Sequence, residues 1–452
     1  MQFNGLRTYD VVGVGFGPSN LALAIALDEL PHAGSPDRMS AAFFERQPSL
    51  HWHSGMLLPG AKMQVSFLKD LVTFRNPVSQ YSFVAYLHAS GRLSGFVNNK
   101  DFFPTRMEFH RYLEWVAARV ADRVTYSAEV AAIRPVRRAD GTVDQVQVEV
   151  RRNGEGSSER IHARNIVVST GLVPKVPAGV VRGPRIWHSS EFLARYRDWE
   201  PGRLKRVAVV GAGQSGAEIV RFLYDTEPAA EIYAVVPSYG YSIADNTPFA
   251  NQIFDAGAVD DFYNAPGPSK RIIWEHHKNT NYSVVDDEVI ESLYQRHYQD
   301  MVEEKRRLHF VNVARLREVA EVGDTVQVDI ESMLTGQLNR LDVDLLICST
   351  GYEPMNPAAI LGELDGYCVR DAENRYCVER DYRVMTSPEL HCGIYLQGGT
   401  EHTHGLSSSL LSNIAVRSGE IVGSIVRRRT QASPGPDGAA VSAEMPDDVK
   451  AV

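Results

Sequence analysis

The chain has 452 residues, of which 44% are hydrophobic and 23% charged, a composition typical of a globular protein with two or three domains. Its formal net charge of −9 argues against nucleic acid as a partner, because phosphate binding requires a basic surface. No stretch has the roughly 18 successive apolar residues of a membrane helix, and the N-terminal residues show no signal-peptide pattern. We therefore expect a cytoplasmic protein without a membrane span.

Two glycine-rich motifs are the most informative feature of the chain. The first, GVGFGP at 13–18, follows an apolar strand at 9–12 and precedes a helix predicted over Ser19–Leu30. The second, GAGQSG at 211–216, directly follows a strand predicted over Arg206–Val210. In this strand–turn–helix context, glycines let the backbone approach a pyrophosphate whose charge meets the helix N-terminus. The pair predicts two bound dinucleotides, with electrons passing between them.

The strand predicted after the first motif indicates which dinucleotide binds there. It covers residues 41–45 and ends in Glu45, whose carboxylate can accept both hydroxyls of an adenosine ribose. A carboxylate would repel the 2′-phosphate of NADP, so Glu45 favours FAD at the first motif. The alternative is that Glu45 is only a solvated acid at a strand end.

The order of the later elements predicts one domain inserted into another. A helix over Arg106–Val120 and a strand over Val146–Val150 precede the buried segment IVVSTG at 166–171. A near copy, LLICSTGY, occurs at 345–352, and the second glycine-rich motif lies between the copies. We therefore expect an α/β fold with two Rossmann-like domains, for FAD and NADPH, the second inserted into the first, plus a small substrate-binding region.

The predicted boundaries follow this layout. They are 1–175 for the first part of the FAD domain, 176–340 for the NADPH domain with substrate-pocket segments in 245–285, 341–430 for the second FAD part with a capping segment, and 431–452 for a disordered tail. The apolar stripe over 410–426 is interpreted as core rather than interface. Oligomeric state stays open, with a dimer or tetramer possible.

Cysteine and histidine spacing argues against two further kinds of site. The four cysteines, at 348, 368, 377 and 392, form no C-x-x-C pair, which excludes the redox dithiol of disulfide reductases. The cysteines also lack the close ligand spacing of a zinc site, and although the histidines at 51, 53, 276 and 277 resemble a metal cluster, we do not assign one to them. We expect reduced thiols and no metal.

Seven further stretches carry a resemblance to a known family. They are HWHSGM at 51–56, KMQVSFLKDL at 62–71, NPVSQYSF at 76–83, DNTPFAN at 245–251, TNYSVV at 280–285, TGY at 350–352 and THGLS at 403–407. With these residues the chain resembles the flavin-dependent N-hydroxylating monooxygenases of siderophore biosynthesis, most closely the L-ornithine N5-monooxygenases. Pro18 matches the variant of the first motif that this family uses.

The resemblance implies a reaction driven by the flavin rather than by acid–base side chains. NADPH reduces FAD, O₂ is captured as a C4a-hydroperoxyflavin, and the deprotonated terminal amine of ornithine takes the distal oxygen. L-Lysine or a diamine, putrescine or cadaverine, remains an alternative, because one methylene changes binding by only about 1–3 kcal/mol. An NAD(P)H–flavin reductase that passes electrons to a partner is the alternative from another class.

The resemblance also implies roles for individual residues. The residues expected to bind FAD are Gly13, Gly15, Gly17, Pro18, Glu45, Trp52, Met63, Gln64 and Ser407. The residues expected to bind NADPH are Arg106, Gly211, Gly213, Gln214, Ser215 and Gly216. The residues expected to bind substrate are Lys69, Asn251, Asn281 and Ser408. Met63 could instead fill core space. Because three serines follow one another, the roles of Ser407 at the flavin and Ser408 at the substrate could be exchanged.

One position departs from the family pattern. Members commonly carry an arginine near Pro237 that holds the 2′-phosphate of NADPH, whereas this chain continues with Ser238 and Tyr239. Neither an arginine nor an acid that would favour NADH is present. We expect NADPH as the reductant, with weak discrimination against NADH.

Overall fold

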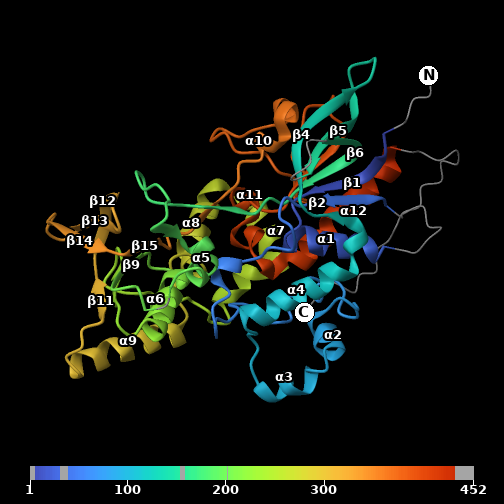
Figure 1. The fold of residues 1–452 in the computed structure, drawn as a ribbon. Helices are drawn as coiled ribbons and strands as arrows, with labels where there is room; N and C mark the ends of the chain where they lie inside the picture. Colours follow the sequence, from blue (N-terminus) through green and yellow to red (C-terminus); the bar gives the residue numbers. More distant parts are fainter. Residues whose placement is uncertain (1–5, 31–38, 153–157, 201, 433–452) are drawn as a thin grey trace.

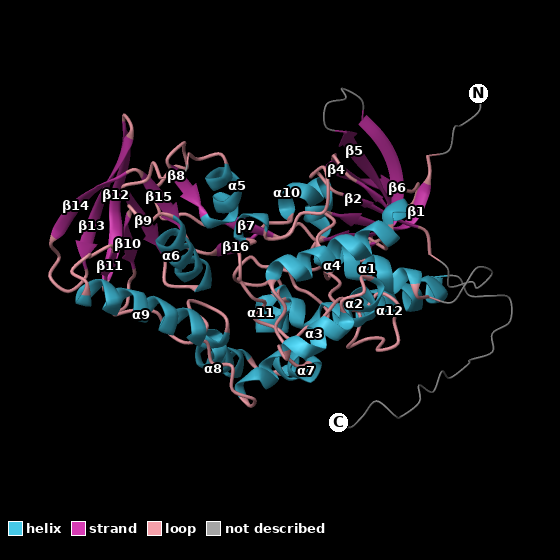
Figure 2. Cartoon of the chain, turned by 60° about the horizontal axis from the view of Figure 1, so that its bottom comes forward, coloured by secondary structure: helices cyan, strands magenta, loops and turns pink. Residues whose placement is uncertain are grey.

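The computed structural model describes residues 6–30, 39–152, 158–200 and 202–432, and its two largest sheets lie at opposite ends of the molecule (Figures 1 and 2). The last helix continues to Ala432 and so includes the first two residues of the predicted tail, and the rest of that predicted tail lies outside the described residues. None of the described helices is long and apolar enough to cross a bilayer.

The first sheet contains the first glycine-rich motif at its centre. Its parallel strands run in the order β3-β2-β1-β6, with β17 also paired to β6, while β5 and β4 extend it in antiparallel fashion. Their bounds are β1 (Thr8–Val14), β2 (Ala41–Phe44), β3 (Val124–Thr125), β4 (Ala128–Arg137), β5 (Val143–Arg152), β6 (Ser158–Val168) and β17 (Gly393–Leu396). Because β17 comes from the far end of the chain, the first domain is discontinuous.

Alternating side chains bury both faces of this sheet. Val11, Phe43 and Val167 pack with α1 (Pro18–Asp28), α4 (Arg106–Arg119) and α12 (Ile414–Ala432). Val12 and Ile166 point to the other face, into a core shared with β4 and β5. The apolar stripe predicted over 410–426 supplies Ile414, Ile421 and Ile425 to the first of these cores, which confirms its interpretation as core.

In the sequence, the strands of the second sheet lie between the two parts of the first domain. The sheet is parallel throughout, in the order β11-β10-β9-β15-β8. Its strands are β8 (Ile186–His188), β9 (Arg206–Val210), β10 (Glu231–Val235), β11 (Leu308–Val311) and β15 (Leu345–Cys348). One face packs on α6 (Gln214–Thr226) and α9 (Asp287–Val302). The other packs on the antiparallel sheet of β12 (Ala314–Val322), β13 (Thr325–Ser332) and β14 (Leu338–Val343).

Two short strands join the domains. β7 (Leu172–Pro174) and β16 (Tyr352–Pro354) follow the two Ser-Thr-Gly segments and pair with each other between the sheets (Figure 2). The remaining helices are α2 (Phe83–Ala89), α3 (Leu93–Asn99), α5 (Phe192–Arg197), α7 (Ala256–Asn264), α8 (Gly267–His277), α10 (Ala358–Leu361) and α11 (Glu401–His404). This architecture confirms the predicted fold of two Rossmann-like domains, the second inserted into the first.

Candidate active site

The three glycines of the first motif face different surroundings. A Cβ at Gly13 would lie 2.2 Å from the Phe43 ring, and one at Gly15, whose φ is +82°, would lie 2.4 Å from the Ser169 carbonyl oxygen. Gly17 is the N-cap residue of α1, and a Cβ there would meet nothing within 4 Å. The first two glycines therefore let the loop pack on its own sheet. The third leaves open space at a helix N-terminus, which suits a pyrophosphate.

The second motif repeats this arrangement. A Cβ at Gly211 would lie 2.1 Å from the Ser349 carbonyl oxygen, whereas one at Gly213, the N-cap residue of α6, would meet only the Ser283 Cα at 3.9 Å. Ser169 and Ser349 belong to the two Ser-Thr-Gly copies, and their amides donate to the last residues of β1 and β9, Val14 and Val210. Both loops thus have the shape that a dinucleotide requires.

Glu45 lies beside the first loop, at the end of β2. Its carboxylate accepts hydrogen bonds from the backbone amides of Phe16 (2.8 Å) and Gln47 (2.9 Å). Trp52 contacts Phe109 with ring centroids 5.6 Å apart, and Met63 is buried in the core of the first domain. Met63 therefore fills core space in this structure, and its predicted contact with the flavin stays a prediction, as does the Glu45–ribose contact.

Unpartnered polar atoms gather after β17. Within the described residues, buried side-chain atoms without a hydrogen-bond partner include Gln397 Oε1, Thr400 Oγ1, Ser408 Oγ and Asn413 Nδ2. The Gln397 amide nitrogen donates to Asn20 Oδ1 (3.0 Å) of α1, so this group lies beside the first motif. Leaving such an atom unpaired costs about 1–3 kcal/mol. An unpaired atom beside the first motif, such as Gln397 Oε1, therefore suits a polar cofactor such as FAD.

Three of the predicted substrate residues belong to segments that meet. Lys69 is half-buried, its Nζ lies 5.9 Å from the centre of the Phe254 ring, and it forms no ion pair with a described residue. Burial lowers the pKa of Lys69, an effect that Asp255 partly offsets. Phe254 ends the 3-10 turn that contains Asn251, and this turn packs on the turn at 406–409 that contains Ser407 and Ser408.

Asn281 approaches the same region from another side. The next residue, Tyr282, donates its hydroxyl to Glu401 Oε1 (2.6 Å), at the start of α11 and just before the serine turn. The Asn251 amide nitrogen donates to the Asn246 carbonyl (2.8 Å), which fixes that side chain. The segments that contain the four predicted substrate residues are therefore connected through contacts near α11. These contacts are made by neighbouring residues of the segments and not by the four side chains with one another.

Three predicted cofactor residues instead belong to a hydrogen-bonded network at the junction of the two domains, which the bonds of Arg106 and Gln64 cross. Arg106 on α4 forms a two-bond ion pair with Glu218 on α6, with N–O distances of 2.6 and 2.9 Å. Gln214 donates to Glu218 (2.8 Å) and to Asp286 (2.9 Å), and its Oε1 accepts from the Asp286 amide (2.8 Å). Gln64 donates to the other Asp286 oxygen (3.0 Å). We call these five residues the junction network.

Glu218 and Asp286 were not predicted from the sequence as site residues. Glu218 is only 1% exposed, and its position on the buried face of α6 is visible only once the domains are packed together. Asp286 could have been noticed from the sequence, because it directly follows the TNYSVV stretch. It also directly precedes α9, where an aspartate is a common N-cap residue. Its side chain makes no cap hydrogen bond and serves the two glutamines instead.

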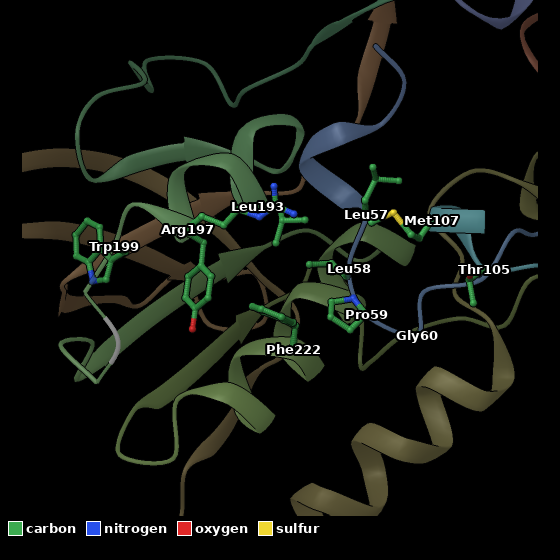
Figure 3. Close-up of a pocket in the computed structure, with 11 residues that line it drawn as sticks. Leu57, Leu58, Pro59, Gly60, Thr105, Met107, Leu193, Arg197, Trp199 and Phe222 are labelled. Carbon is green, nitrogen blue, oxygen red and sulfur yellow. The ribbon is translucent and has the colours of Figure 1, made fainter. Parts of the chain in front are cut away.

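A cavity of about 470 Å³ lies between the two domains, and Thr105 and Met107, the chain neighbours of Arg106, are among its lining residues (Figure 3). It is lined by Leu57, Leu58, Pro59 and Met107 from the first domain and by Leu193, Trp199 and Phe222 from the second, among others. The predicted site residues are not among its lining residues. Apolar packing between the domains is therefore incomplete at this cavity, although Met56, Leu57 and Leu58 of the first domain pack in the core of the second.

Comparison with known proteins assigns the chain to a family. The model of L-lysine 6-monooxygenase/L-ornithine 5-monooxygenase matches residues 7–354. The L-ornithine N(5)-monooxygenases of Burkholderia cepacia and Pseudomonas aeruginosa are 38% and 35% identical, over 88% and 92% of this chain and 90% and 93% of theirs.

Solved structures agree with this assignment. The ornithine N-hydroxylase of Kutzneria sp. 744, in a form with reduced FAD, NADP+ and L-ornithine, is 58% identical, with a TM-score of 0.90 over 93% of this chain and 100% of that one. The L-lysine 6-monooxygenase of Pseudomonas syringae is 29% identical, with a TM-score of 0.81 over 93% of this chain and 99% of that one. The chain therefore belongs to the family of flavin-dependent L-lysine 6-monooxygenases and L-ornithine 5-monooxygenases.

Proposed function

We propose that the protein converts L-ornithine to N5-hydroxy-L-ornithine with NADPH and O₂, for a hydroxamate siderophore or a related natural product. The observation that carries the choice of an amino acid is Lys69, a half-buried cation that forms no ion pair among the described residues and lies next to the turn of Asn251. Such a cation suits the α-carboxylate of a free amino acid. Ornithine is favoured over lysine because the relatives with 35–38% identity are named L-ornithine enzymes.

The residues of the site have distinct tasks in this proposal. Lys69 binds the α-carboxylate, while the neutral amides of Asn251 and Asn281 orient the chain of the substrate and leave its terminal amine free to lose a proton. A carboxylate at that position would hold the amine as an unreactive ammonium ion. Ser408, in the turn at 406–409, contributes a hydroxyl to the substrate site. The chemistry that bound FAD supplies is oxygen activation after its reduction by NADPH.

The two nucleotides have separate places in this proposal. The open N-terminus of α1, with Gly13, Gly15, Gly17, Pro18 and Glu45, holds FAD, and Trp52, Met63, Gln64 and Ser407 line its flavin. The N-terminus of α6, with Gly211, Gly213, Gln214, Ser215 and Gly216, holds NADPH, and Arg106 fixes the distance between the two sites through Glu218.

The test measures how much hydroxylamine forms for each NADPH oxidised, with several amines as substrate. Purified enzyme with FAD is given NADPH and L-ornithine, L-lysine or putrescine, and hydroxylamine formation is compared with NADPH oxidation. We expect a ratio near one with ornithine only, and uncoupled peroxide release with putrescine, which has no carboxylate for Lys69. Equal NADPH oxidation with every amine and no hydroxylamine would support an electron-passing reductase instead. A cytoplasmic location and assembly into a dimer or tetramer remain predictions, which cell fractionation and light scattering would measure.

A further inference from the structure

One charged side chain occupies a core position of the last helix. Arg417 shares the buried face of α12 with Ile414 and Ile421, at helical spacing, and is only 1% exposed. It forms no ion pair with a described residue. The nearby carboxylate of Glu420 is held by Arg380 through two bonds of 2.9 and 3.0 Å. Burial accordingly lowers the pKa of Arg417.

The hydrogen bonds of Arg417 lead to the first glycine-rich motif. One terminal nitrogen donates to the carbonyl of Ser408, and the other donates to Ser19 Oγ at 3.2 Å, while Nε has no partner among the described residues. Ser19 directly follows Pro18 in the first turn of α1, next to the open side of Gly17. A serine hydroxyl that accepts a bond from an arginine keeps its own hydrogen for a second acceptor.

A buried cation without a counter-ion is costly unless an anion comes near it. The N-terminus of α1 already attracts negative charge through its backbone amides, and a pyrophosphate brings two negative charges. We propose that Arg417 is a positioning residue of the FAD site, which supplies a fixed positive charge behind α1 and directs the Ser19 hydroxyl toward the pyrophosphate of FAD. This inference rests on the proposed placement of FAD at the first motif.

A purely structural role is the competing explanation, in which Arg417 only ties the serine turn to α1. The two roles predict opposite effects on the protein without cofactor. If Arg417 serves the pyrophosphate, its buried charge destabilises the apoprotein until FAD binds. Its removal then leaves the stability of the apoprotein unchanged or higher and weakens FAD binding. If Arg417 only links the serine turn to α1, its removal lowers the stability of the apoprotein.

The experiment compares Arg417→Met, Arg417→Lys and the control Arg428→Met, an exposed position on the same helix. We measure the Kd of FAD by titrating apoprotein, the Tm of the apoprotein, and the Kd of NADP+ as an internal control at the second motif. For Arg417→Met we expect a Kd for FAD raised about tenfold or more, the loss of one charge-assisted interaction. The apoprotein Tm should be unchanged or higher and the Kd of NADP+ unchanged. Arg417→Lys, which retains the charge, should recover part of the FAD affinity.

Two results would overturn the proposal: an unchanged Kd for FAD, or a fall in apoprotein Tm with both nucleotide Kd values rising together. Should Arg417→Met fail to fold, Ser19→Ala decides, because it retains the arginine and removes the hydroxyl. A raised Kd for FAD with an unchanged apoprotein Tm supports the proposal, and an unchanged Kd contradicts it. Wild-type protein that binds no FAD would instead remove the proposed cofactor site and function together.

Discussion

Lys69 is the side chain on which the proposed choice of substrate depends. Replacing it with methionine should raise the KM for ornithine about 10- to 100-fold, because one hydrogen bond to a charged group contributes about 1.5–3 kcal/mol. The rate at which NADPH reduces the flavin should hardly change, since Lys69 does not belong to the junction network. Steady-state kinetics and stopped-flow reduction measure the two effects separately, and Lys100→Met, at an exposed position, is the control.

The same variant gives a dependence on pH with a defined sign. Burial lowers the pKa of Lys69, and a bound carboxylate would raise it again. Ornithine should therefore bind best below the pKa of Lys69 in the free enzyme, and this advantage should be lost as the pH rises through that pKa. Because the substrate amines titrate equally in both proteins, the ratio of KM values between wild type and Lys69→Met isolates the lysine. A ratio of one at every pH would exclude the role of Lys69.

At the scale of single elements, we expect the segment that follows β10 to set the preference between the two nicotinamide nucleotides. Ser238, which could have contacted a 2′-phosphate, donates its hydroxyl to the Gly240 carbonyl (2.6 Å), and Tyr239 is 78% exposed. We expect wild type to prefer NADPH by less than about 100-fold in kcat/KM, because a full charge-assisted phosphate contact is missing. Ser238→Arg should increase this preference, whereas Ser238→Ala should leave it nearly unchanged. A wild-type preference of several hundred-fold would show that another side chain holds the phosphate.

The predictable elements are those whose signal is local. The glycine-rich motifs, the helix after each and the two Ser-Thr-Gly strands were predicted because each combines an apolar run with a specific turn. Boundaries were less accurate: the helix predicted to end at Leu30 ends at Asp28, and that predicted to end at Val120 ends at Arg119. The antiparallel sheet β12–β14 was not predicted, although β13 has the same alternation of apolar and polar residues as β5.

Site residues show the same division. Recurrent stretches of sequence identified Lys69 and Asn251, which lie on neighbouring segments in the structure. Arg417 and Glu218 were missed because their importance comes from burial by elements distant in the chain. Arg417 nevertheless had a detectable signal, since a charge interrupts an otherwise apolar helix face at the position of a core residue.

At the scale of the whole molecule, the proposed function places one nucleotide in each of two domains, which several contacts join. The β7–β16 ribbon joins them covalently, the junction network joins them by hydrogen bonds, and the cavity lies between them. The network also places Gln64 and Gln214 on one carboxylate, that of Asp286. Since the predicted FAD and NADPH residues thus share a partner, the position of one domain depends on the other.

The Arg106–Glu218 pair should therefore contribute both to stability and to electron transfer between the domains. Arg106 is 12% exposed and Glu218 1%, so Glu218→Gln leaves a nearly buried cation without its counter-charge, at a cost of about 3 kcal/mol in the free energy of unfolding. We also expect slower reduction of the flavin by NADPH, measured by stopped flow at saturating nucleotide. Glu200→Gln, which breaks the exposed pair with Arg203, is the matched control and should change neither quantity. In a double-mutant cycle, Arg106→Met should cost much less in the Glu218→Met background than in wild type, because the pair is then already broken. Additive losses would mean that the two side chains act independently and that the junction is held by its apolar contacts.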